Sequence, residues 1–452
     1  MATRGEASGG LAVETIESVG GLRALEAEWR VLEARLPRLP FVTFDWLLTW
    51  WENLAEDRLL IRDQLHVLAI RDAHGGLVAV APLMLTLRPG VERLAVRQLQ
   101  LFGADPNLTE IRTLAVADSE RLRVYAALVR HLQGQAQRWD WFLLTGVPSA
   151  DELKATVEQS FARVKWLRSV PDYTLALPAS YAAFKLSLSR NIKESLRKCY
   201  NSLKRNGLSF EFRALSDVDD VGHALEHFFR LHRLRAALPG TVPHPDVFAA
   251  ESSCRFLRAV CRRFAERGKL RVFQLKIGDR VVATRIGFLC EDCLYLYYSG
   301  YDPAFKQYSV MTTLVAESIR FAIEHGLATV NLSTGRDVSK LRWGPRETEY
   351  GDALIVTPSL RGQIAYDLCA AAKQTLLFAQ QHTRALDALT RRAEPRSTPP
   401  SAAGVSGSAS APPSESSAPP SESGRPPVSE ATARGDAALS ERSLRASRLG
   451  RG

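Results

Sequence analysis

The chain has 452 residues, of which 46% are hydrophobic, and it carries a formal net charge of +10. This length and apolar content predict two domain cores and exclude a small disulfide-stabilised module. The basic excess suits a phosphorylated ligand, RNA or an anionic surface, and charge alone does not choose among them.

The N-terminal residues lack the basic-then-apolar order of a secretion signal, and the longest apolar runs, such as residues 77–87, are too short to cross a membrane. Six cysteines without regular spacing indicate reduced thiols. The histidines and cysteines also show no metal-ligand spacing. We therefore expect a cytoplasmic, soluble protein that has no transmembrane segment and needs no metal.

An order of elements repeats along the chain. A β-hairpin is predicted at residues 65–81 and again at 270–284. Each hairpin is followed by a helical pattern and then a buried strand, with the helices at 121–133 and 311–324. The strands that follow cover 139–146 and 327–335. This repetition indicates an internal duplication.

The repetition sets the expected domains. We predict a flexible N-terminus at 1–10, a first α/β half at 11–170 and a second half at 171–390. Each half should have a mixed central sheet flanked by helices. Residues 391–452 are rich in Ser and Pro, contain no aromatic residue and should be disordered.

The second half opens with a basic amphipathic helix at 189–206. Its apolar positions fall on one face at Ile192, Leu196, Cys199 and Leu203, while its cationic positions line another. Asn191 and Glu194 have capping-box spacing, and Gly207 is placed to end the helix. The cationic face is either solvated or holds an anionic ligand or RNA.

An aromatic strand at 295–301 leads through a loop into a helix that begins near Ser309. The free N–H groups and positive dipole at such a helix N-terminus are suited to a pyrophosphate. The candidate binding positions are consecutive in the sequence: Ser309, Val310, Met311 and Thr312. The segment has no glycine-rich loop, so an ordinary strand-to-helix connection remains the alternative.

Five motifs together resemble the CelD-like acetyltransferases of the GNAT superfamily, which are related to FemAB-type aminoacyl transferases. They are Ser189-Arg190-Asn191, Leu231-His232-x-x-Arg235, the hairpin 270–285, Tyr298-x-Gly300-Tyr301-Asp302-Pro303-x-Phe305, and Gly335-Arg336-Asp337-x-x-Lys340-x-Arg342-Trp343-Gly344. The resemblance covers about residues 180–365 and extends more weakly to Phe44-Asp45-Trp46-x-x-x-Trp50-Trp51. It implies tandem GNAT-like domains.

The resemblance also implies a reaction, in which acyl-CoA lies between two diverging parallel strands and an acceptor attacks the thioester. Asp337 or Asp302 would then act as the base and Tyr308 as the acid. Three cations, Arg336, Lys340 and Arg342, would hold anionic groups of the substrate. Alternatively, Asp337 only caps the turn after its strand and the cations are solvated.

Three functions follow from this resemblance. The first is an acyl-CoA-dependent acyltransferase, with acetyl-CoA as the expected donor. It would act on an amino or hydroxyl group of a sugar or amino-sugar intermediate of envelope polysaccharide. The second is a FemAB-like transferase that uses aminoacyl-tRNA, favoured by the basic helix. The third is a non-catalytic binding module, favoured because Ser309-Val310-Met311 stands where the family tends to have Ser-Pro-Gly. Acyl-CoA affinity separates the first from the other two.

Overall fold

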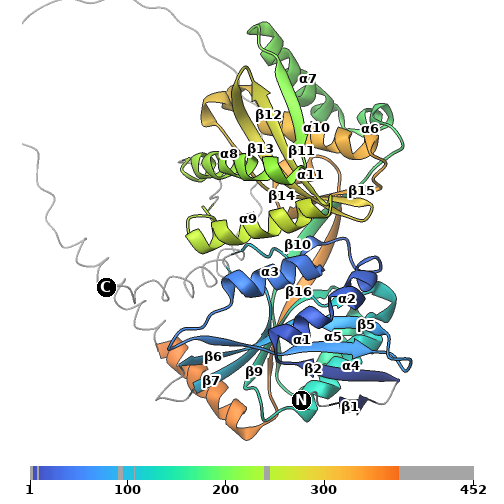
Figure 1. Cartoon of the computed structure of the whole chain (residues 1–452), viewed down its shortest axis with the longest axis vertical. Helices are drawn as coiled ribbons and strands as arrows, with labels where there is room; N and C mark the ends of the chain where they lie inside the picture. Colours follow the sequence, from blue (N-terminus) through green and yellow to red (C-terminus); the bar gives the residue numbers. More distant parts are fainter. Residues whose placement is uncertain (1–3, 8–9, 90–94, 106, 239–244, 376–452) are drawn as a thin grey trace, which may run out of the picture. The chain divides into compact units, whose positions relative to one another are not determined.

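One mixed sheet runs through both halves of the chain and has eleven strands among the described residues (Figure 1). The structure is a computed structural model that describes residues 4–7, 10–89, 95–105, 107–238 and 245–375. In spatial order the strands are β11 (Phe210–Leu215), β12 (Leu270–Ile277), β13 (Arg280–Cys290), β14 (Cys293–Tyr301), β15 (Thr329–Thr334), β10 (Val164–Ala176), β16 (Arg346–Val356), β9 (Trp141–Pro148), β7 (Ala95–Leu101), β6 (Leu83–Pro89) and β3 (Arg62–Leu65). The pairs β14–β15 and β7–β9 are parallel, and the other neighbours are antiparallel.

A smaller sheet belongs to the first half. Its strands lie in the order β1 (Arg4–Ala7), β2 (Leu11–Ile16), β4 (Val67–Arg71), β5 (Leu77–Ala81) and β8 (Ala115–Val116). The helices are α1 (Val19–Ala24), α2 (Glu26–Glu33), α3 (Phe44–Leu54), α4 (Arg121–Gly134), α5 (Asp151–Ser160), α6 (Tyr181–Ser187), α7 (Arg190–Arg205), α8 (Val218–Ala236), α9 (Glu251–Glu266), α10 (Val310–Glu324) and α11 (Val338–Leu341), with 3-10 turns η1 (Pro40–Val42), η3 (Asp118–Glu120) and η4 (Pro303–Tyr308). The tail predicted at 391–452 lies outside the described residues.

The predicted repetition of elements is confirmed. Strands β4 and β5 form the first antiparallel hairpin, and β12 and β13 form the second. Helix α4 precedes the buried strand β9, and α10 precedes β15 in the same order. The glycines of the two hairpin turns support the pattern, since Gly75 has a φ of +84° and Gly278 a φ of +58°.

Strand β16 joins the two halves. It comes from the C-terminal end of the fold, yet it pairs with β10 on one side and with β9 on the other. The predicted boundary near residue 170 falls inside β10, and residues Met1–Lys373 form one compact unit. The division into 11–170 and 171–390 therefore stays a prediction, because the sheet has no break at that point.

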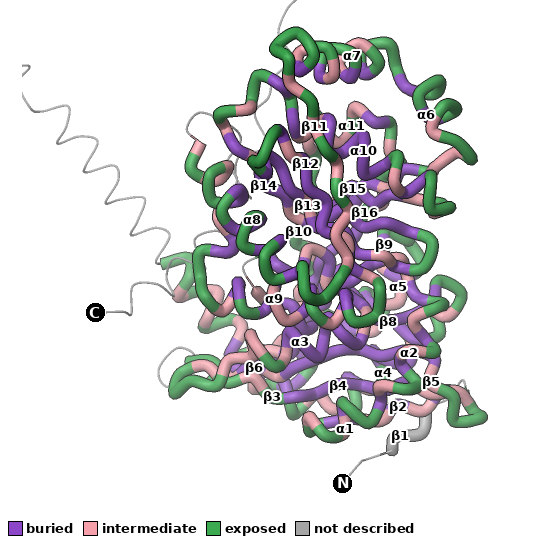
Figure 2. Tube along the Cα trace, turned by 45° about the horizontal axis from the view of Figure 1, so that its top comes forward, coloured by how far each residue is buried: buried purple, intermediate pink, exposed green. Residues whose placement is uncertain are grey.

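Alternation along β14 separates two helical layers in the second half. Leu294 and Leu296 pack into a core shared with α7 and α10, whereas Tyr295 and Tyr297 face a core shared with α3, α8 and α9. Successive side chains of a strand point to opposite faces, so one strand supplies both cores. Figure 2 shows this burial in purple along β13 and β14.

A close approach of α8 to β14 explains why the motif at 298–305 has a glycine at position 300. A Cβ atom at Gly300 would lie 2.3 Å from the backbone nitrogen of His232. His232 is buried, and its Nδ1 lies 3.2 Å from the carbonyl oxygen of Ser299. The structure therefore gives this histidine a packing role, as its lack of metal-ligand spacing indicates.

The amphipathic helix α7 buries the predicted face, since its four apolar positions are all buried. Gly207 has a φ of +66° and follows the helix end, as predicted. The predicted capping box is wrong. The N-cap is Ser189, and Asn191 lies inside the first turn, where Glu194 pairs instead with Arg190 at 3.2 Å.

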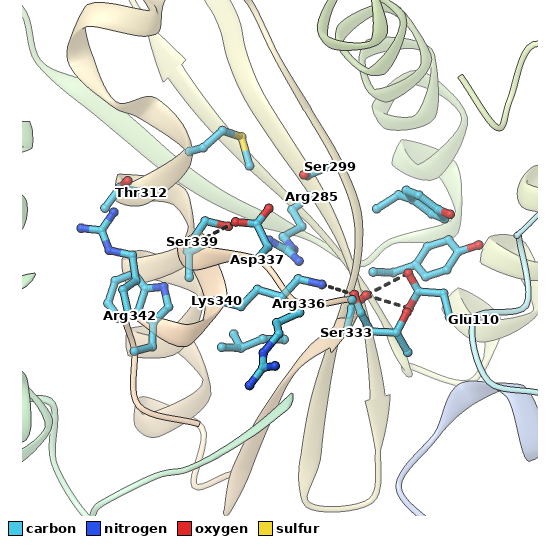
Figure 3. Close-up of a pocket in the computed structure, with 18 of the residues that line it drawn as sticks. Glu110, Arg285, Ser299, Thr312, Ser333, Arg336, Asp337, Ser339, Lys340 and Arg342 are labelled. Atoms are coloured by element: carbon cyan, nitrogen blue, oxygen red, sulfur yellow. Dashed lines mark hydrogen bonds between the residues drawn. The ribbon is translucent and has the colours of Figure 1, made fainter. Parts of the chain in front are cut away.

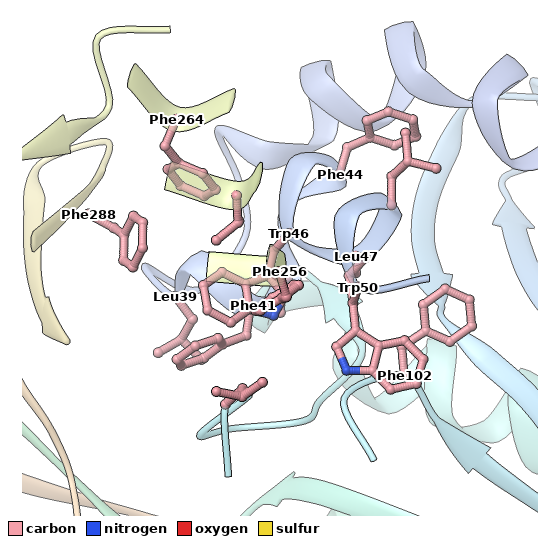
Figure 4. Packing of buried hydrophobic residues seen from close by; sticks show 14 of the residues in the cluster. Leu39, Phe41, Phe44, Trp46, Leu47, Trp50, Phe102, Phe256, Phe264 and Phe288 are labelled. Atoms are coloured by element: carbon pink, nitrogen blue, oxygen red, sulfur yellow. The ribbon is translucent and has the colours of Figure 1, made fainter. Parts of the chain in front are cut away.

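An aromatic core binds the first half to the second. Trp46 on α3 is fully buried, and its ring centroid lies 5.3 Å from that of Phe256 and 5.7 Å from those of Phe288 and Tyr297 (Figure 4). Its indole N–H donates to Thr109 Oγ1 at 3.1 Å. The aromatic motif of residues 44–51 thus packs against the second half.

We expect Trp46→Ala to lower the free energy of unfolding by about 3–5 kcal/mol, because it empties a large site in this shared core. Denaturant unfolding should show one cooperative transition, since the core contains residues of both halves. Val31→Ala, at a position that is 77% exposed, is the control and should change stability by less than about 0.5 kcal/mol. Two separate transitions in the parent protein would contradict the single shared core.

Candidate active site

The candidate site lies where β14 and β15 separate. The two strands pair in parallel only where Cys293–Tyr295 of β14 lie beside Thr329–Asn331 of β15. Beyond these residues β14 continues beside β13, while β15 stays with β10. A cavity of about 450 Å³ opens between them and is lined on its two sides by residues 297–299 and 332–334.

A backbone kink in β15 maintains this separation. Ser333 has a φ of +72°, a conformation that costs a non-glycine residue of order 1–3 kcal/mol. The side chain of Asn331 offsets this cost by accepting a hydrogen bond from the Ser333 N–H at 2.7 Å. Asn331 is itself held, because its amide donates to Asp172 Oδ2 on β10 at 2.8 Å. Gly335 follows with a φ of +92°, a conformation that glycine adopts without strain.

The kink directs a hydroxyl to a carboxylate from the first half. Ser333 Oγ lies 2.8 Å from both carboxylate oxygens of Glu110, and Tyr295 donates to the same group at 2.5 Å. Burial raises the pKa of Glu110, while the charge of Lys340 opposes that shift. A carboxyl group with a raised pKa is suited to accept a proton near neutral pH.

Lys340 faces this carboxylate from α11. Its ammonium group donates to the carbonyl oxygen of Thr334 at the end of β15. Burial lowers the pKa of Lys340 to about 8, against the opposing effect of Glu110. At neutral pH the lysine is still mainly protonated, so it can donate a hydrogen bond to charge that develops in the cavity.

Two guanidinium groups line the same wall. Arg285 on β13 donates to the carbonyl oxygen of Leu296, and its buried Nε has no partner among the described residues. Burial, together with the charge of Arg235, lowers the pKa of Arg285 to about 10. Arg235 donates to Ser299 Oγ at 2.9 Å. Two cations held this close favour a ligand with an anionic group.

The other end of the cavity is the N-terminus of α10. Ser309 caps this helix in the left-handed conformation, with a φ of 52° and no capping hydrogen bond from its side chain. Among the described residues, no group accepts a hydrogen bond from the N–H groups of Val310 or Met311. Met311 stands inside the first turn of α10 and lines the cavity. This end therefore fits a phosphate group.

Figure 3 shows the arrangement of the whole cavity. Glu110 and Ser333 lie at one end, Thr312 and Arg342 at the other, and Lys340 between them. The predicted residues that the structure brings together on the cavity wall are Met311, Thr312, Arg336, Asp337, Lys340 and Arg342.

Asp337 lies on the wall but also caps α11. Its Oδ1 accepts a hydrogen bond from the Ser339 N–H at 2.7 Å. The capping alternative raised from the sequence is thus present in the structure. A catalytic role for Asp337 stays a prediction, and Glu110 is the second carboxylate that faces the same cavity.

The other predicted residues do not line this cavity. Asp302 caps η4 by accepting from the Ala304 N–H at 3.0 Å and pairs with Arg280 at 2.6 Å. Tyr308 is buried, and its hydroxyl accepts from Asn206 at 2.8 Å. Ser309 is the N-cap of α10 and Val310 its first residue, and neither lines the cavity. Asp302 and Tyr308 therefore have structural partners. Strand β14 ends at Tyr301, Asp302 is the N-cap of the turn η4 and Tyr308 its last residue, and both lie outside the cavity lining.

Residues 190–341 match the family model of an acetyltransferase (GNAT) domain. The matched segment is similar to a GNAT-type acetyltransferase domain. The family match makes the chain an acyltransferase, as predicted, and supports an acyl-CoA co-substrate. No curated protein sequence matches the chain.

Among solved structures, FemX is similar to this chain with a TM-score of 0.50 and 11% identity, covering 72% of this chain and 95% of FemX. A conserved protein of unknown function from Bacteroides thetaiotaomicron has a TM-score of 0.45 and 13% identity, with 75% and 99% covered. A tandem GNAT protein of the clavulanic acid biosynthesis pathway has a TM-score of 0.38 and 10% identity, with 77% and 99% covered. The tandem GNAT-like fold predicted from the sequence is confirmed by the family match and by the repeated order of elements in the two halves.

No helix of the described residues is both long enough and apolar enough to cross a membrane. Within the same residues, no cluster of three or more His, Cys, Asp or Glu side chains is placed to hold a metal ion.

The buried carboxyl of Asp172 generates a stability prediction. Burial raises its pKa to about 7, from about 3.9 in an unfolded chain. The folded state therefore holds a proton that the unfolded state has lost between these two values, and stability should fall as pH rises through this window.

We expect Asp172→Asn to remove this contribution while keeping an oxygen for Asn331. The stability of the variant relative to the parent should increase between about pH 4 and pH 7, by a few kcal/mol at most. Denaturant unfolding across this pH range measures the difference. A difference that does not change with pH would show that Asp172 titrates alike in both states.

Proposed function

We propose that the chain transfers an acyl group, in the first place acetyl, from acyl-CoA to an amino or hydroxyl group of a sugar or amino-sugar intermediate of envelope or exopolysaccharide synthesis. The observation that carries this proposal is the separation of β14 and β15 around one cavity. That cavity has free helix N–H groups at one end and a carboxylate beside a lysine at the other.

The residues at the two ends suit different parts of the reaction. The N-terminus of α10, with Thr312 and Arg342 beside it, would hold the pyrophosphate through N–H groups, a positive helix dipole and a guanidinium. When bound, acyl-CoA supplies the thioester carbon that is attacked. Directing that carbon toward Glu110 requires the donor to lie along the opening between the strands.

At the other end, Glu110 would take the proton that the acceptor nitrogen or oxygen loses as it forms its bond to the acyl carbon. The bond from that carbon to sulfur breaks, and the sulfur takes up a proton. Lys340, with its pKa near 8, is the group beside the cavity that can supply this proton or hydrogen-bond the developing charge. Proton uptake and release then balance within the site.

The acceptor end also has groups that suit a polar, anionic acceptor. Tyr298 presents an aromatic ring there, and its hydroxyl exchanges hydrogen bonds with Asn107 at 2.7 and 2.9 Å. Arg235 and Arg285 lie on the same wall. A sugar that carries a phosphate or carboxylate would use the ring, the amide and the guanidinium groups together.

A second candidate function is a FemAB-like transfer from aminoacyl-tRNA. It is favoured by the similarity to FemX and by the cationic face of α7. Such a donor would bind through many phosphate contacts, and its affinity would fall steeply with salt.

Donor binding tests the first function directly. Acetyl-CoA at about 100 times its dissociation constant should stabilise the protein by roughly 2.7 kcal/mol in a thermal-shift measurement. Arg342→Gln should weaken this binding, because it removes a cation beside the pyrophosphate end. Arg346→Gln, an exposed position on β16 outside the cavity, is the matched control. Stabilisation by aminoacyl-tRNA but not by acetyl-CoA would establish the second function instead.

Turnover tests the assignment of the base. With an acceptor in hand, Glu110→Gln should lower turnover by more than about tenfold, near 1.4 kcal/mol of transition-state stabilisation, and remove the acidic limb of the pH profile. Glu349→Gln, an exposed carboxylate outside the cavity, should leave turnover unchanged. If Asp337→Asn abolishes turnover while Glu110→Gln retains it, Asp337 is the base.

A further inference from the structure

A second cavity lies between α6, α7 and α10. It has a volume of about 380 Å³ and shares no lining residue with the active-site cavity. Its walls are formed by Tyr181, Lys185, Leu188, Lys193, Leu196, Arg197, Tyr200, Glu317 and Arg320. The acyl-transfer mechanism uses none of these residues.

The inner surface of this second cavity is apolar and aromatic. Leu188 and Leu196 line it while each remains only 6% exposed to solvent, so their side chains form its floor. The rings of Tyr181 and Tyr200 complete the wall. Leu186, 78% exposed on the same helix as Lys185, adds apolar surface beside it. An aliphatic chain would gain free energy by covering such a surface.

The one acidic group of the wall is already engaged. Glu317 accepts a hydrogen bond from the Tyr200 hydroxyl at 2.5 Å, and burial together with this carboxylate raises the pKa of Tyr200. Glu317 also lies 3.9 Å from Arg320. The carboxylate is therefore engaged with Tyr200 and Arg320, and it forms no ion pair with Lys185, Lys193 or Arg197.

Four cations border the cavity. Lys185 lies 5.2 Å from the centre of the Tyr181 ring, and Lys193 donates to the carbonyl oxygen of Leu186 at 2.8 Å. Arg320 pairs with Glu324 at 2.7 Å. In the described part of the chain, no carboxylate forms an ion pair with Lys185, Lys193 or Arg197. Three exposed cations thus face an apolar cavity without an acid to balance them.

We infer that this second cavity binds a single-chain anionic amphiphile, with its phosphate or carboxylate at the cations and its aliphatic chain on the leucine floor. A free polar anion would leave the apolar floor uncovered, and a neutral amphiphile would leave the three cations unmatched. Only a ligand with both parts complements the whole wall. The inference is independent of the acyl-transfer reaction.

Titration calorimetry on the full chain tests this inference with four probes. Octyl phosphate and octanoate share the anionic amphiphile chemistry and differ in the head group, while octyl glucoside lacks the charge and inorganic phosphate lacks the chain. At least one of the two anionic octyl compounds should bind about tenfold or more tightly than both comparison probes. The tighter of the two identifies the head group. Equal binding of octyl glucoside, or of inorganic phosphate, would overturn the inference.

Variants place the binding in the cavity. Arg197→Gln and Lys193→Gln change exposed side chains, and each should weaken the better octyl compound by about threefold or more. Leu196→Trp should block the cavity, with its folding checked by thermal unfolding. Lys204→Gln and Arg205→Gln are the matched controls, because these exposed cations lie on the same helix and do not line the cavity. If the controls weaken binding as much as Arg197→Gln, the ligand only follows the general charge of α7 and the cavity assignment fails.

Discussion

The departure of β15 from β14 is the constraint on which the candidate site depends. A continued parallel pairing would close the sheet and leave no room for a ligand between the strands. The chain prevents this with an unfavourable backbone conformation at Ser333, and it places a buried amide, Asn331, where it can hold that conformation. The side chain of Asn331 is held in turn by Asp172 on the neighbouring strand. Local strain is thus supported by the sheet rather than by the loop that follows.

The first half of the chain completes the site rather than merely duplicating the second. Glu110 belongs to this half, and the aromatic core around Trp46 helps to hold it against Ser333 and Tyr295 of the second half. Strand β16 adds a second connection, since it lies between β9 and β10. A carboxylate from one half and a lysine from the other can keep a steady separation only in such a joined fold.

The sequence supports some of these features and not others. The hairpins, the buried face of α7 and the helix α10 could be predicted because their periodicity is local. Glu110 could not, because residues 107–112 carry no recognisable motif and their meeting with β14 depends on contacts about 190 residues apart. The sequence predicts Asp302 at the site from its place in a motif, and Tyr308 from the reaction that the resemblance implies. The end of β14 was predicted correctly, but the direction of the chain beyond it is set by η4 and the Arg280 ion pair, which no local pattern indicates.

The ionisation of Asp172, Glu110 and Lys340 is coupled, because the charge of each affects the pKa of a neighbour. Asp172 and Glu110 are both buried, and the charge of Glu110 raises the pKa of Asp172, while the ammonium of Lys340 lowers the pKa of both. Taking either carboxyl out of water is costly, so burial favours the neutral form of each. The single lysine between two acids therefore allows one negative charge to persist at modest cost. Because Glu110 accepts two hydroxyl hydrogen bonds and Asp172 has an oxygen without a partner among the described residues, the negative charge is better supported on Glu110. The same polar network that holds the kink in β15 thus also favours the charged form of Glu110 beside the cavity.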